Sequence, residues 1–242
     1  MDVLAFHDVT KRFGAHEALR GVSFDVRPGE IFGLLGPNGA GKTTSIRIAV
    51  DILRPDSGEV RLFGAKLARD ALDRVSYLPE ERGLYRKSRV DDVLVYLGEL
   101  KGLSRDDAEE RTERWLERLG LVDAADARVE SLSKGNQQKV QIAGALLHDP
   151  ELAILDEPFS GLDPLNVELV LGLLAERKER GLTTVLSTHV MEKVETLCDR
   201  VVLIHRGERL LYGTVDEVRG LGDARRSMDA VFVDAVRAWE DR

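Results

Sequence analysis

The sequence of 242 residues contains a single cysteine, Cys198, so no disulfide can form within the chain, and we expect Cys198 to be a small buried apolar residue. No uncharged apolar stretch approaches the roughly 20 residues that a membrane-spanning helix needs. Residues 1–3 lack the basic-then-apolar pattern of a secretion signal. Internal repeats and low-complexity segments are also missing. These absences predict a cytosolic chain whose only route to a membrane is a partner.

The charge balance is acidic, with a formal net charge of −8. A globally acidic chain is poorly suited to non-specific binding of nucleic acid, so no nucleic-acid partner is expected. Hydrophobic residues make up 43% of the chain and charged residues 32%, which is ordinary for a globular protein. The length is sufficient for one large domain or for one domain with a subdomain.

Short β-prone runs alternate with helical patterns along most of the chain. The predicted strands are residues 3–7, 21–26, 31–35, 59–63, 152–155, 183–186 and 201–204, and the predicted helices include residues 45–53, 137–147 and 167–180. The run 31–35 is continuously apolar, as in a buried parallel strand. Between about residues 88 and 147 helical spacing dominates, with Ser104 as a predicted helix cap. The pattern predicts an α/β fold with a mainly parallel sheet and an inserted helical segment.

Residues 36–43 match the phosphate-binding pattern G-x-x-x-x-G-K-[ST] in full. Glycines let backbone N–H groups surround a phosphate, Lys42 supplies a cation, and the hydroxyl of Thr43 is suited to ligate Mg²⁺. The position between a predicted buried strand and a predicted helix disfavours a chance glycine-rich turn. The residues expected to contact ATP here are Gly36, Pro37, Asn38, Gly39, Ala40, Gly41, Lys42, Thr43 and Thr44. This motif alone does not separate a kinase, a GTPase, a motor and a transporter ATPase.

Two adjacent carboxylates, Asp156 and Glu157, follow the apolar run 152–155. Successive side chains leave a strand in opposite directions, so the two carboxylates are placed for different roles. Asp156 is the candidate for holding a metal ion, and Glu157 is the candidate for polarising the attacking water. The alternative is a solvated acidic turn after a core strand, which the presence of a phosphate loop in the same chain disfavours.

Residues 132–138 read Leu-Ser-Lys-Gly-Asn-Gln-Gln and lead into a predicted helix. A hydroxyl and an amide without a side chain, from Ser133 and Gly135, would make a second anion site at the helix start. Taken alone, the segment is equally well explained as a helix capped by serine. Together with the two other motifs, it resembles the L-S-G-G-Q signature of the ABC (ATP-binding cassette) ATPases, and this resemblance covers about residues 3–213.

The resemblance implies a P-loop NTPase (RecA-like) core, an N-terminal antiparallel β-subdomain and an inserted α-helical subdomain at about residues 88–147. It places one ABC ATPase domain at residues 1–220 and a short C-terminal extension at residues 221–242. The roles that it implies are catalysis for Glu157 and His189, adenine stacking for Phe13 with support from Ala18, and contact with an opposing subunit for Asp163. The signature residues expected to face ATP across a dimer are Ser133, Lys134, Gly135 and Asn136, and the expected Mg²⁺ ligands are Thr43, Glu80 and Asp156.

The sequence departs from the family pattern at several of these positions. Glu80 stands where the Q-loop usually has glutamine, which adds a formal charge near the expected metal. Lys134 replaces the first signature glycine and Asn136 replaces the signature glutamine, but the hydroxyl of Ser133 and the amide of Gly135 remain, so ATP hydrolysis is expected. Phe13 replaces the commoner tyrosine and retains the ring face.

The family pattern implies ATP and Mg²⁺ as cofactors and two kinds of partner. A second ABC subunit, identical or different, would complete a head-to-tail dimer, and a transmembrane permease subunit would be driven by it. On this interpretation the chain is cytoplasmic and lies on the inner face of the cell membrane through the permease. The permease, rather than this chain, would choose the transported substrate.

Two features favour export as the direction of transport. Residues 77–85, Tyr-Leu-Pro-Glu-Glu-Arg-Gly-Leu-Tyr, resemble those of bacterial ABC-2-type exporters, including the sodium-extrusion and drug-export subgroups. We also expect no regulatory β-domain of the kind that follows the core in many sugar importers. The competing interpretation is a soluble ABC ATPase that acts on nucleic acid or the ribosome, and the acidic charge and the ordinary size of the helical insertion disfavour it.

Overall fold

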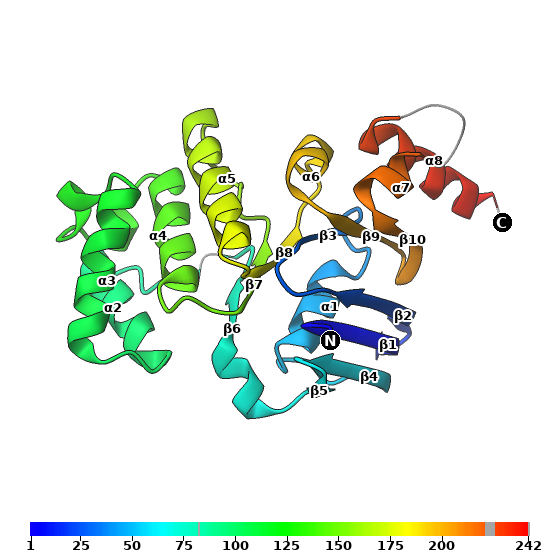
Figure 1. Cartoon of the computed structure of the whole chain (residues 1–242), viewed down its shortest axis with the longest axis horizontal. Coiled ribbons are helices and arrows are strands. Elements are labelled where there is room, and N and C mark those ends of the chain that lie inside the picture. The colour runs from blue at the N-terminus through cyan, green and yellow to red at the C-terminus, as the bar shows by residue number, and fades with distance from the viewer. Residues whose placement is uncertain (82, 221–225, 242) are drawn as a thin grey trace. The chain divides into compact units, whose positions relative to one another are not determined.

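The computed structural model describes residues 1–81, 83–220 and 226–241, which form two compact units (Figure 1). The first unit comprises Met1–Leu72 and Leu174–Arg242, and the second comprises Asp73–Leu173. Helix α5 (Pro164–Glu179) begins in the second range and ends in the first. Both units combine strands with helices, and the predicted α/β class is confirmed, with an antiparallel sheet and a mainly parallel arrangement of the remaining strands.

An antiparallel sheet opens the first unit, with strand order β2-β1-β4-β5. Its strands are β1 (Leu4–Phe13), β2 (His16–Val26), β4 (Ser57–Leu62) and β5 (Ala65–Lys66). Strands β1 and β2 form a hairpin in which Phe13 lies opposite His16. They extend beyond the predicted runs 3–7 and 21–26 because backbone pairing continues through polar residues at the hairpin end, where no apolar alternation marks a strand.

The remaining strands of the first unit follow the order β10-β9-β3-β8. They are β3 (Ile31–Leu35), β8 (Thr183–Ser187), β9 (Arg200–His205) and β10 (Glu208–Thr214). Strand β3 pairs in parallel with β8 and β9, while β10 runs antiparallel to β9. Every residue of β3, β8 and β9 is buried, as in parallel strands covered on both faces. Strand β10 is only half-buried and was not predicted, because it lacks such an apolar run.

A stack of phenylalanines joins the two sheets of the first unit. The rings of Phe6 and Phe24 are stacked with centroids 4.6 Å apart, and the ring of Phe32 continues the stack 5.6 Å from Phe24. These residues lie on β1, β2 and β3, so the core connects the N-terminal hairpin to the strand that precedes the phosphate loop. Cys198 is buried in the same unit, as expected, and burial raises the pKa of its thiol far above the ordinary value.

The helices of the first unit are α1 (Lys42–Ala49), α6 (Met191–Leu197), α7 (Val215–Arg219) and α8 (Met228–Glu240). The prediction of a helix at 45–53 was wrong at both ends. Gly41 adopts a left-handed conformation and starts α1 at Lys42, and the helix ends at Ala49, shortly before Asp51, which has a φ of 56°. Helix α8 lies within the expected C-terminal extension, of which residues 221–225 and 242 are outside the described residues.

The second unit consists of a pair of parallel strands and a group of helices. Its elements are β6 (Val75–Leu78), β7 (Leu152–Asp156), α2 (Val90–Leu100), α3 (Arg105–Arg118), α4 (Lys134–Leu146) and short 3₁₀ turns at Val122–Ala124 and Val129–Ser131, with a further 3₁₀ turn, Arg69–Arg74, at the boundary. Ser104 caps α3 as predicted, because its hydroxyl accepts a hydrogen bond from Asp107 N at 3.2 Å. Helix α4 begins three residues before the predicted 137.

Candidate functional site

The predicted phosphate loop connects β3 to α1 in the first unit. Gly41 has a φ of +113°, and a Cβ built there would lie 2.7 Å from the carbonyl oxygen of Ala18. Gly36 has a φ of +152°, and a Cβ there would lie 2.2 Å from the carbonyl oxygen of Ile204. Side chains at either position would therefore collide with neighbouring backbone. The sequence folds in this way locally because only glycine permits this close approach at both ends of the loop.

Lys42 is held inside this loop. Its side-chain Nζ donates to the carbonyl oxygens of Gly36 at 2.8 Å and Pro37 at 3.3 Å, and the residue is buried. Ser45 closes the first turn of α1 through a 3.0 Å hydrogen bond from its hydroxyl to Gly41 O. The positive end of the helix and the Lys42 ammonium group thus lie at one place, which is the electrostatic arrangement that binds a phosphate. Thr43 and Thr44 are half-buried in the same turn.

The two residues predicted to contact adenine occupy different environments. Phe13 ends β1 and is 47% exposed, with the Lys11 ammonium group 5.7 Å from its ring centroid. Ala18 is buried on β2, and its carbonyl oxygen lies against Gly41. The structure therefore brings Ala18 next to the start of α1 and leaves about half of Phe13 exposed to solvent.

In the second unit, β7 delivers the two predicted carboxylates. All five residues of β7 are buried, including Asp156 at its end, and Glu157 is also buried. Glu157 has a φ of +50°, which a residue with a side chain seldom adopts. Such strain persists only where surrounding contacts hold it: Ser160 N donates to Glu157 O at 3.1 Å, and Gln138 Nε2 donates to Pro158 O at 3.1 Å.

The signature segment forms the start of α4. The hydroxyl of Ser133 accepts a 3.2 Å hydrogen bond from Asn136 N, so Ser133 is the N-cap residue. Ser133 and Lys134 are exposed, whereas Asn136 is half-buried. A Cβ at Gly135 would lie 3.2 Å from Gly161 O, which shows that this turn of α4 packs closely on the segment after β7.

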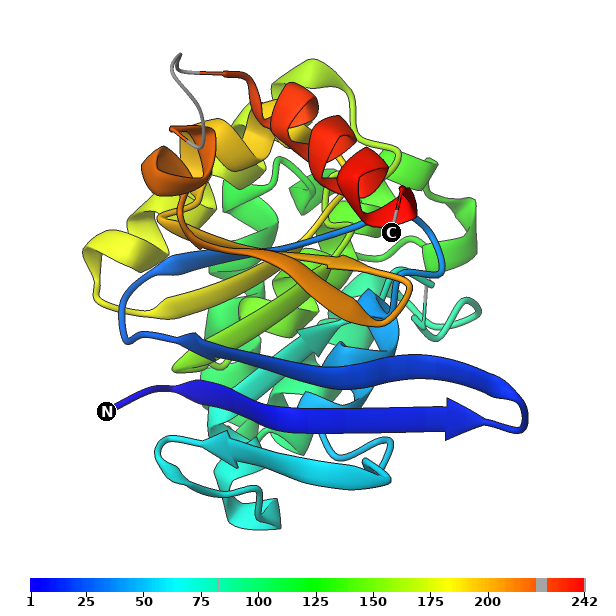
Figure 2. The same cartoon turned by 90° about the vertical axis from the view of Figure 1, so that its right-hand side faces the viewer.

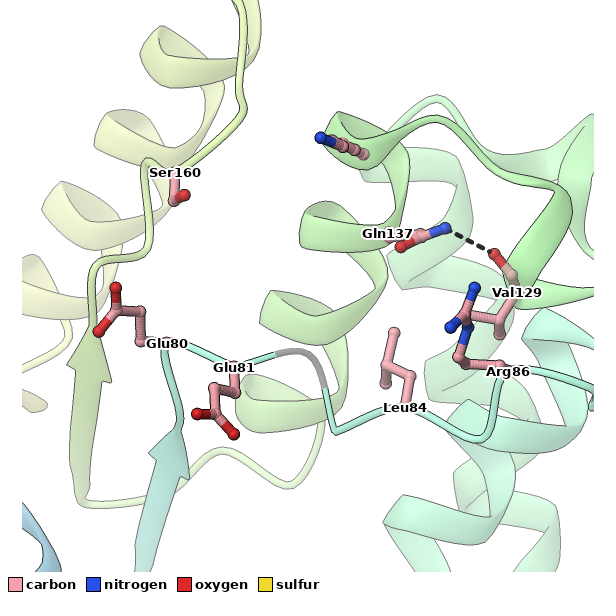
Figure 3. A pocket seen from close by; sticks show the side chains of 8 residues that line it. Glu80, Glu81, Leu84, Arg86, Val129, Gln137 and Ser160 are labelled. Atoms are coloured by element: carbon pink, nitrogen blue, oxygen red, sulfur yellow. Dashed lines mark hydrogen bonds between the residues drawn. The ribbon is translucent and has the colours of Figure 1, made fainter.

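A pocket of about 540 Å³ lies beside this helix start (Figure 3). It is lined by Glu80, Glu81, Leu84, Arg86, Val129, Lys134, Gln137 and Ser160. Figure 3 shows Glu80 and Ser160 on one side of the pocket and Gln137, Val129 and Arg86 on the other. Glu80 and Lys134, two of the departures from the family pattern, carry opposite charges and line this same pocket. The pocket thus unites the predicted Q-loop, the signature and the segment that leads to Asp163.

Two glutamines on α4 were missed by the sequence analysis. Gln141 donates from Nε2 to Pro79 O at 3.0 Å and to Glu81 O at 3.3 Å, so it holds the segment around Glu80. Gln138 holds the segment after Glu157 in the same manner. Both are buried amides, and Gln141 lies between the buried apolar residues Val140 and Ile142, whereas Gln138 lies beside the buried Lys139. For Gln141, a polar residue between two apolar ones was the available signal in the sequence.

Asp163 and His189 are placed by the ends of other elements. Asp163 Oδ1 accepts from Asn166 N at 2.9 Å and Oδ2 accepts from Asn166 Nδ2 at 2.7 Å, and these hydrogen bonds lower the pKa of Asp163. Asp163 therefore caps the start of α5. His189 is exposed between β8 and α6, next to a turn closed by a 3.1 Å hydrogen bond from Val190 N to the hydroxyl of Thr188. Their roles in catalysis and subunit contact stay predictions.

Comparison with known proteins decides the family. The family model described as "ABC transporter" matches residues 19–160. An uncharacterized ABC transporter ATP-binding protein of Methanocaldococcus jannaschii is 45% identical over 211 residues, which cover 87% of this chain and 77% of that protein. The chain belongs to the ABC transporter family.

Other members of the ABC transporter family agree in sequence and in structure. The Nod factor export ATP-binding protein I of Paraburkholderia xenovorans is 40% identical over 213 residues, covering 87% of this chain and 70% of that protein. The solved ATP binding subunit of an ABC transporter superposes with a TM-score of 0.89 at 34% identity, covering 97% and 99% of the two chains. A dimeric ATP-binding cassette in a post-hydrolysis state with ADP and Pi gives a TM-score of 0.80 at 25% identity, covering 88% and 98%.

Family membership makes the chain an ATP-binding subunit of a transporter and an ATPase, which confirms the resemblance drawn from the sequence motifs. Within residues 1–81, 83–220 and 226–241, no helix combines the length and the apolar character needed to cross a bilayer. The contacts of the candidate side chains with ATP, Mg²⁺ and another subunit stay predictions.

Proposed function

We propose that the chain acts as a head-to-tail ABC dimer, with each ATP held between residues 36–44 of one protomer and the start of α4 in the other. The observation that carries this proposal is the exposure of Ser133 and Lys134 at the N-terminus of a 13-residue helix. A hydroxyl, an ammonium group and the positive end of a helix together favour an anion from outside the chain. The solved ATP-binding cassette bound to ADP and Pi is dimeric, which supports a dimer for this chain as well.

The bridging role of the terminal phosphate explains how hydrolysis becomes motion. Lys42 would bind it from one protomer, and Ser133 and Gly135 from the other, so ATP favours a closed dimer and ADP does not. His189 would contact the same phosphate, and Asp163 would contact the opposing subunit. Loss of the bridge after hydrolysis lets the protomers separate, and a rigid-body movement of this kind is transmitted to a membrane partner.

The residues that would hold Mg²⁺ supply oxygen ligands, which this ion prefers. They are the hydroxyl of Thr43 and the carboxylates of Asp156 and Glu80. Within the described part of the chain, no three His, Cys, Asp or Glu side chains cluster as a metal site would require. When bound, Mg²⁺ would neutralise phosphate charge, and Glu157 would accept a proton from the attacking water.

The proposed direction of transport is export through a separate permease. The Nod factor export ATP-binding protein I supports this direction by its name. The match to transporter subunits also favours transport over action on nucleic acid or the ribosome, as does the net charge of −8. Isolation of the chain together with a membrane protein, after mild solubilisation of membranes, would test this part of the proposal.

The Glu157→Gln variant tests the catalytic part. It should bind ATP, lose hydrolysis and accumulate an ATP-dependent dimer, because the amide cannot accept the proton of the attacking water. ATP hydrolysis and size-exclusion chromatography with and without ATP measure both effects. Glu151→Gln is the matched control, because Glu151 lies on the exposed approach to β7 and pairs with Arg74 at 2.6 Å. Near wild-type hydrolysis by Glu157→Gln would show that Glu157 is not the base, and a lack of dimer would contradict the shared ATP site.

A further inference from the structure

The turn between β9 and β10 lies directly behind the phosphate loop. Gly207 N donates to Ala40 O at 2.9 Å, and Gly207 O accepts from Arg20 N at 2.8 Å. A Cβ at Gly207 would lie 2.8 Å from Ala18 O. At the other end of the loop, Gly36 packs against the carbonyl oxygen of Ile204. The backbone of residues 204–207 therefore supports the loop at its beginning and near its end.

The hydrogen bond to Ala40 O has a consequence for the loop interior. The carbonyl of Ala40 and the N–H of Gly41 belong to one planar trans peptide, so they point in opposite directions. A bond that fixes the carbonyl toward Gly207 consequently fixes the N–H of Gly41 on the opposite side of the peptide. Backbone N–H groups of this loop type bind the phosphates of a nucleotide, so their direction governs nucleotide affinity.

The turn that makes this bond is unfavourable by itself. His205 pairs with Glu208, which leaves Arg206 and Gly207 as a two-residue hairpin loop. Their φ angles are 45° and 81°, the pattern of a type I′ turn. A type I′ turn needs positive φ at both central residues and therefore prefers Asn-Gly or Gly-Gly. Arginine, like other residues with a bulky side chain, adopts positive φ only at a cost in energy. Contacts outside the turn must therefore favour the observed conformation of Arg206.

Trp239 on α8 supplies these contacts. Its ring lies 5.2 Å from the guanidinium carbon of Arg206 and meets the ring of His205 edge-on at 5.0 Å. Its Nε1 donates to Glu208 Oε2 at 3.0 Å. One indole thus contacts both flanking residues of the turn and its strained first residue. Figures 1 and 2 show α8 beside the β9–β10 hairpin, in the same unit as the loop.

We propose that Trp239 is a positioning residue for nucleotide binding, which holds the 206–207 turn so that Gly207 orients the Ala40–Gly41 peptide toward the phosphates. The inference rests on the proposed ATP site at residues 36–44. By linkage, bound nucleotide strengthens the docking of α8 as much as α8 strengthens nucleotide binding. The C-terminal helix is thereby a point at which a partner could alter ATP affinity without contact with ATP.

Titration of the full chain with a non-hydrolysable ATP analogue tests this inference. Trp239→Ala should weaken binding by roughly fivefold or more, within the usual range of coupling between sites. In ATPase assays the KM of Trp239→Ala for ATP should rise while kcat at saturating ATP is largely retained. This is the result expected when a substitution weakens binding of the ground state and of the transition state equally. Trp115→Ala is the matched control, because the Trp115 ring lies 5.2 Å from the Arg118 guanidinium carbon on α3 and is not part of the loop support.

A second substitution separates positioning from general stability. Arg206→Asn creates an Asn-Gly turn that adopts positive φ readily, so it should restore ATP-analogue affinity to the Trp239→Ala variant. Unchanged affinity in Trp239→Ala, or a loss that Arg206→Asn leaves in place, would overturn the inference. Wild-type protein and Lys42→Ala are measured in parallel: failure of the wild type to bind the analogue, or undiminished binding by Lys42→Ala, would instead contradict the proposed ATP site.

Discussion

The guanidinium group of Arg200 lies 3.4 Å from the carboxylate of Glu30, and both side chains are less than a tenth exposed. Arg200 also binds Asp25 Oδ2 at 3.0 Å and the hydroxyl of Tyr212. Tyr212 in turn donates to Asp25 Oδ1 at 2.5 Å. The group connects β2, the start of β3, β9 and β10, so it secures the strands that flank the phosphate loop from behind.

Arg200→Met should lower the free energy of unfolding by about 3–5 kcal/mol, because it leaves the carboxylate of Glu30 buried without its cation. Urea-induced unfolding followed by circular dichroism measures this change. The control is Arg74→Met, which removes an exposed pair with Glu151 and should cost no more than about 1 kcal/mol. Equal losses in the two variants would contradict a special role for the buried pair.

Two carboxylates that contact Arg200, those of Glu30 and Asp25, should make the stability of the fold depend on pH in opposite directions. Burial raises the pKa of Glu30, although hydrogen bonding to Arg27 and the charge of Arg200 oppose it. A raised pKa means that the folded state binds the proton more tightly, so this contribution to stability is complete at low pH and is lost as pH rises through the folded-state pKa. For Asp25, burial works to raise the pKa, but hydrogen bonds from Tyr212 and Arg200 outweigh it and the pKa falls. Its contribution is therefore lost as pH decreases.

Unfolding curves at a series of acidic pH values test these signs. Glu30→Gln should remove the loss of unfolding free energy that occurs as the pH rises. Asp25→Asn should remove the loss of unfolding free energy that occurs as the pH falls. Comparison of each variant with the wild type at every pH separates the two contributions. A Glu30→Gln variant that follows the wild-type pH profile would show that Glu30 does not titrate differently in the folded state.

Phe13→Ala should weaken ATP binding by about 1–3 kcal/mol through the loss of stacking on adenine. The side chain is 47% exposed, so the substitution should leave the unfolding midpoint nearly unchanged. Isothermal titration with an ATP analogue measures the affinity. Phe13→Tyr retains the ring face and serves as the control. If Phe13→Ala binds the analogue like the wild type, adenine does not stack on this ring.

The part of the site that could be predicted from the sequence depends on local backbone geometry. The loop at residues 36–43 has a fixed spacing because glycines, lysine and the helix start act within one turn of chain. Gln141 and Gln138 escaped prediction because their partners, Pro79 and Pro158, lie 62 and 20 residues away in sequence. Nothing local to a glutamine indicates which distant carbonyl it will meet.

In the fold, too, features set by local sequence could be predicted, whereas features set by distant contacts could not. The strand at residues 31–35 was predicted with its correct bounds, because a fully buried strand is apolar throughout. Strand β10 was missed because it is only half-buried and lacks an apolar run, and helix α6 was missed because its seven residues are too few to show a helical pattern. The support of the phosphate loop by Gly207 and Trp239 belongs to this second class, because it joins three distant segments of the chain.

Ser133 allows helix capping to be separated from phosphate binding. Ser133→Ala should lose about 1 kcal/mol of stability and most ATPase activity, because it removes both the cap of α4 and the hydroxyl proposed to face ATP. Ser133→Asp should keep the stability, since aspartate is an equally good cap, but should lose ATPase activity because its charge repels phosphate. Unfolding and ATP hydrolysis are measured on the same preparations.

Ser104 provides the matched control for this comparison, because it caps α3 through the same 3.2 Å hydrogen bond to its N3 amide and has no proposed contact with nucleotide. Ser104→Ala should reproduce the stability loss of Ser133→Ala and keep the ATPase activity. If Ser133→Asp hydrolyses ATP as well as the wild type, then no phosphate approaches this helix start, and the head-to-tail arrangement is wrong. If the Ser133 variants lose ATPase activity only in proportion to their loss of unfolding free energy, then Ser133 acts only as a helix cap.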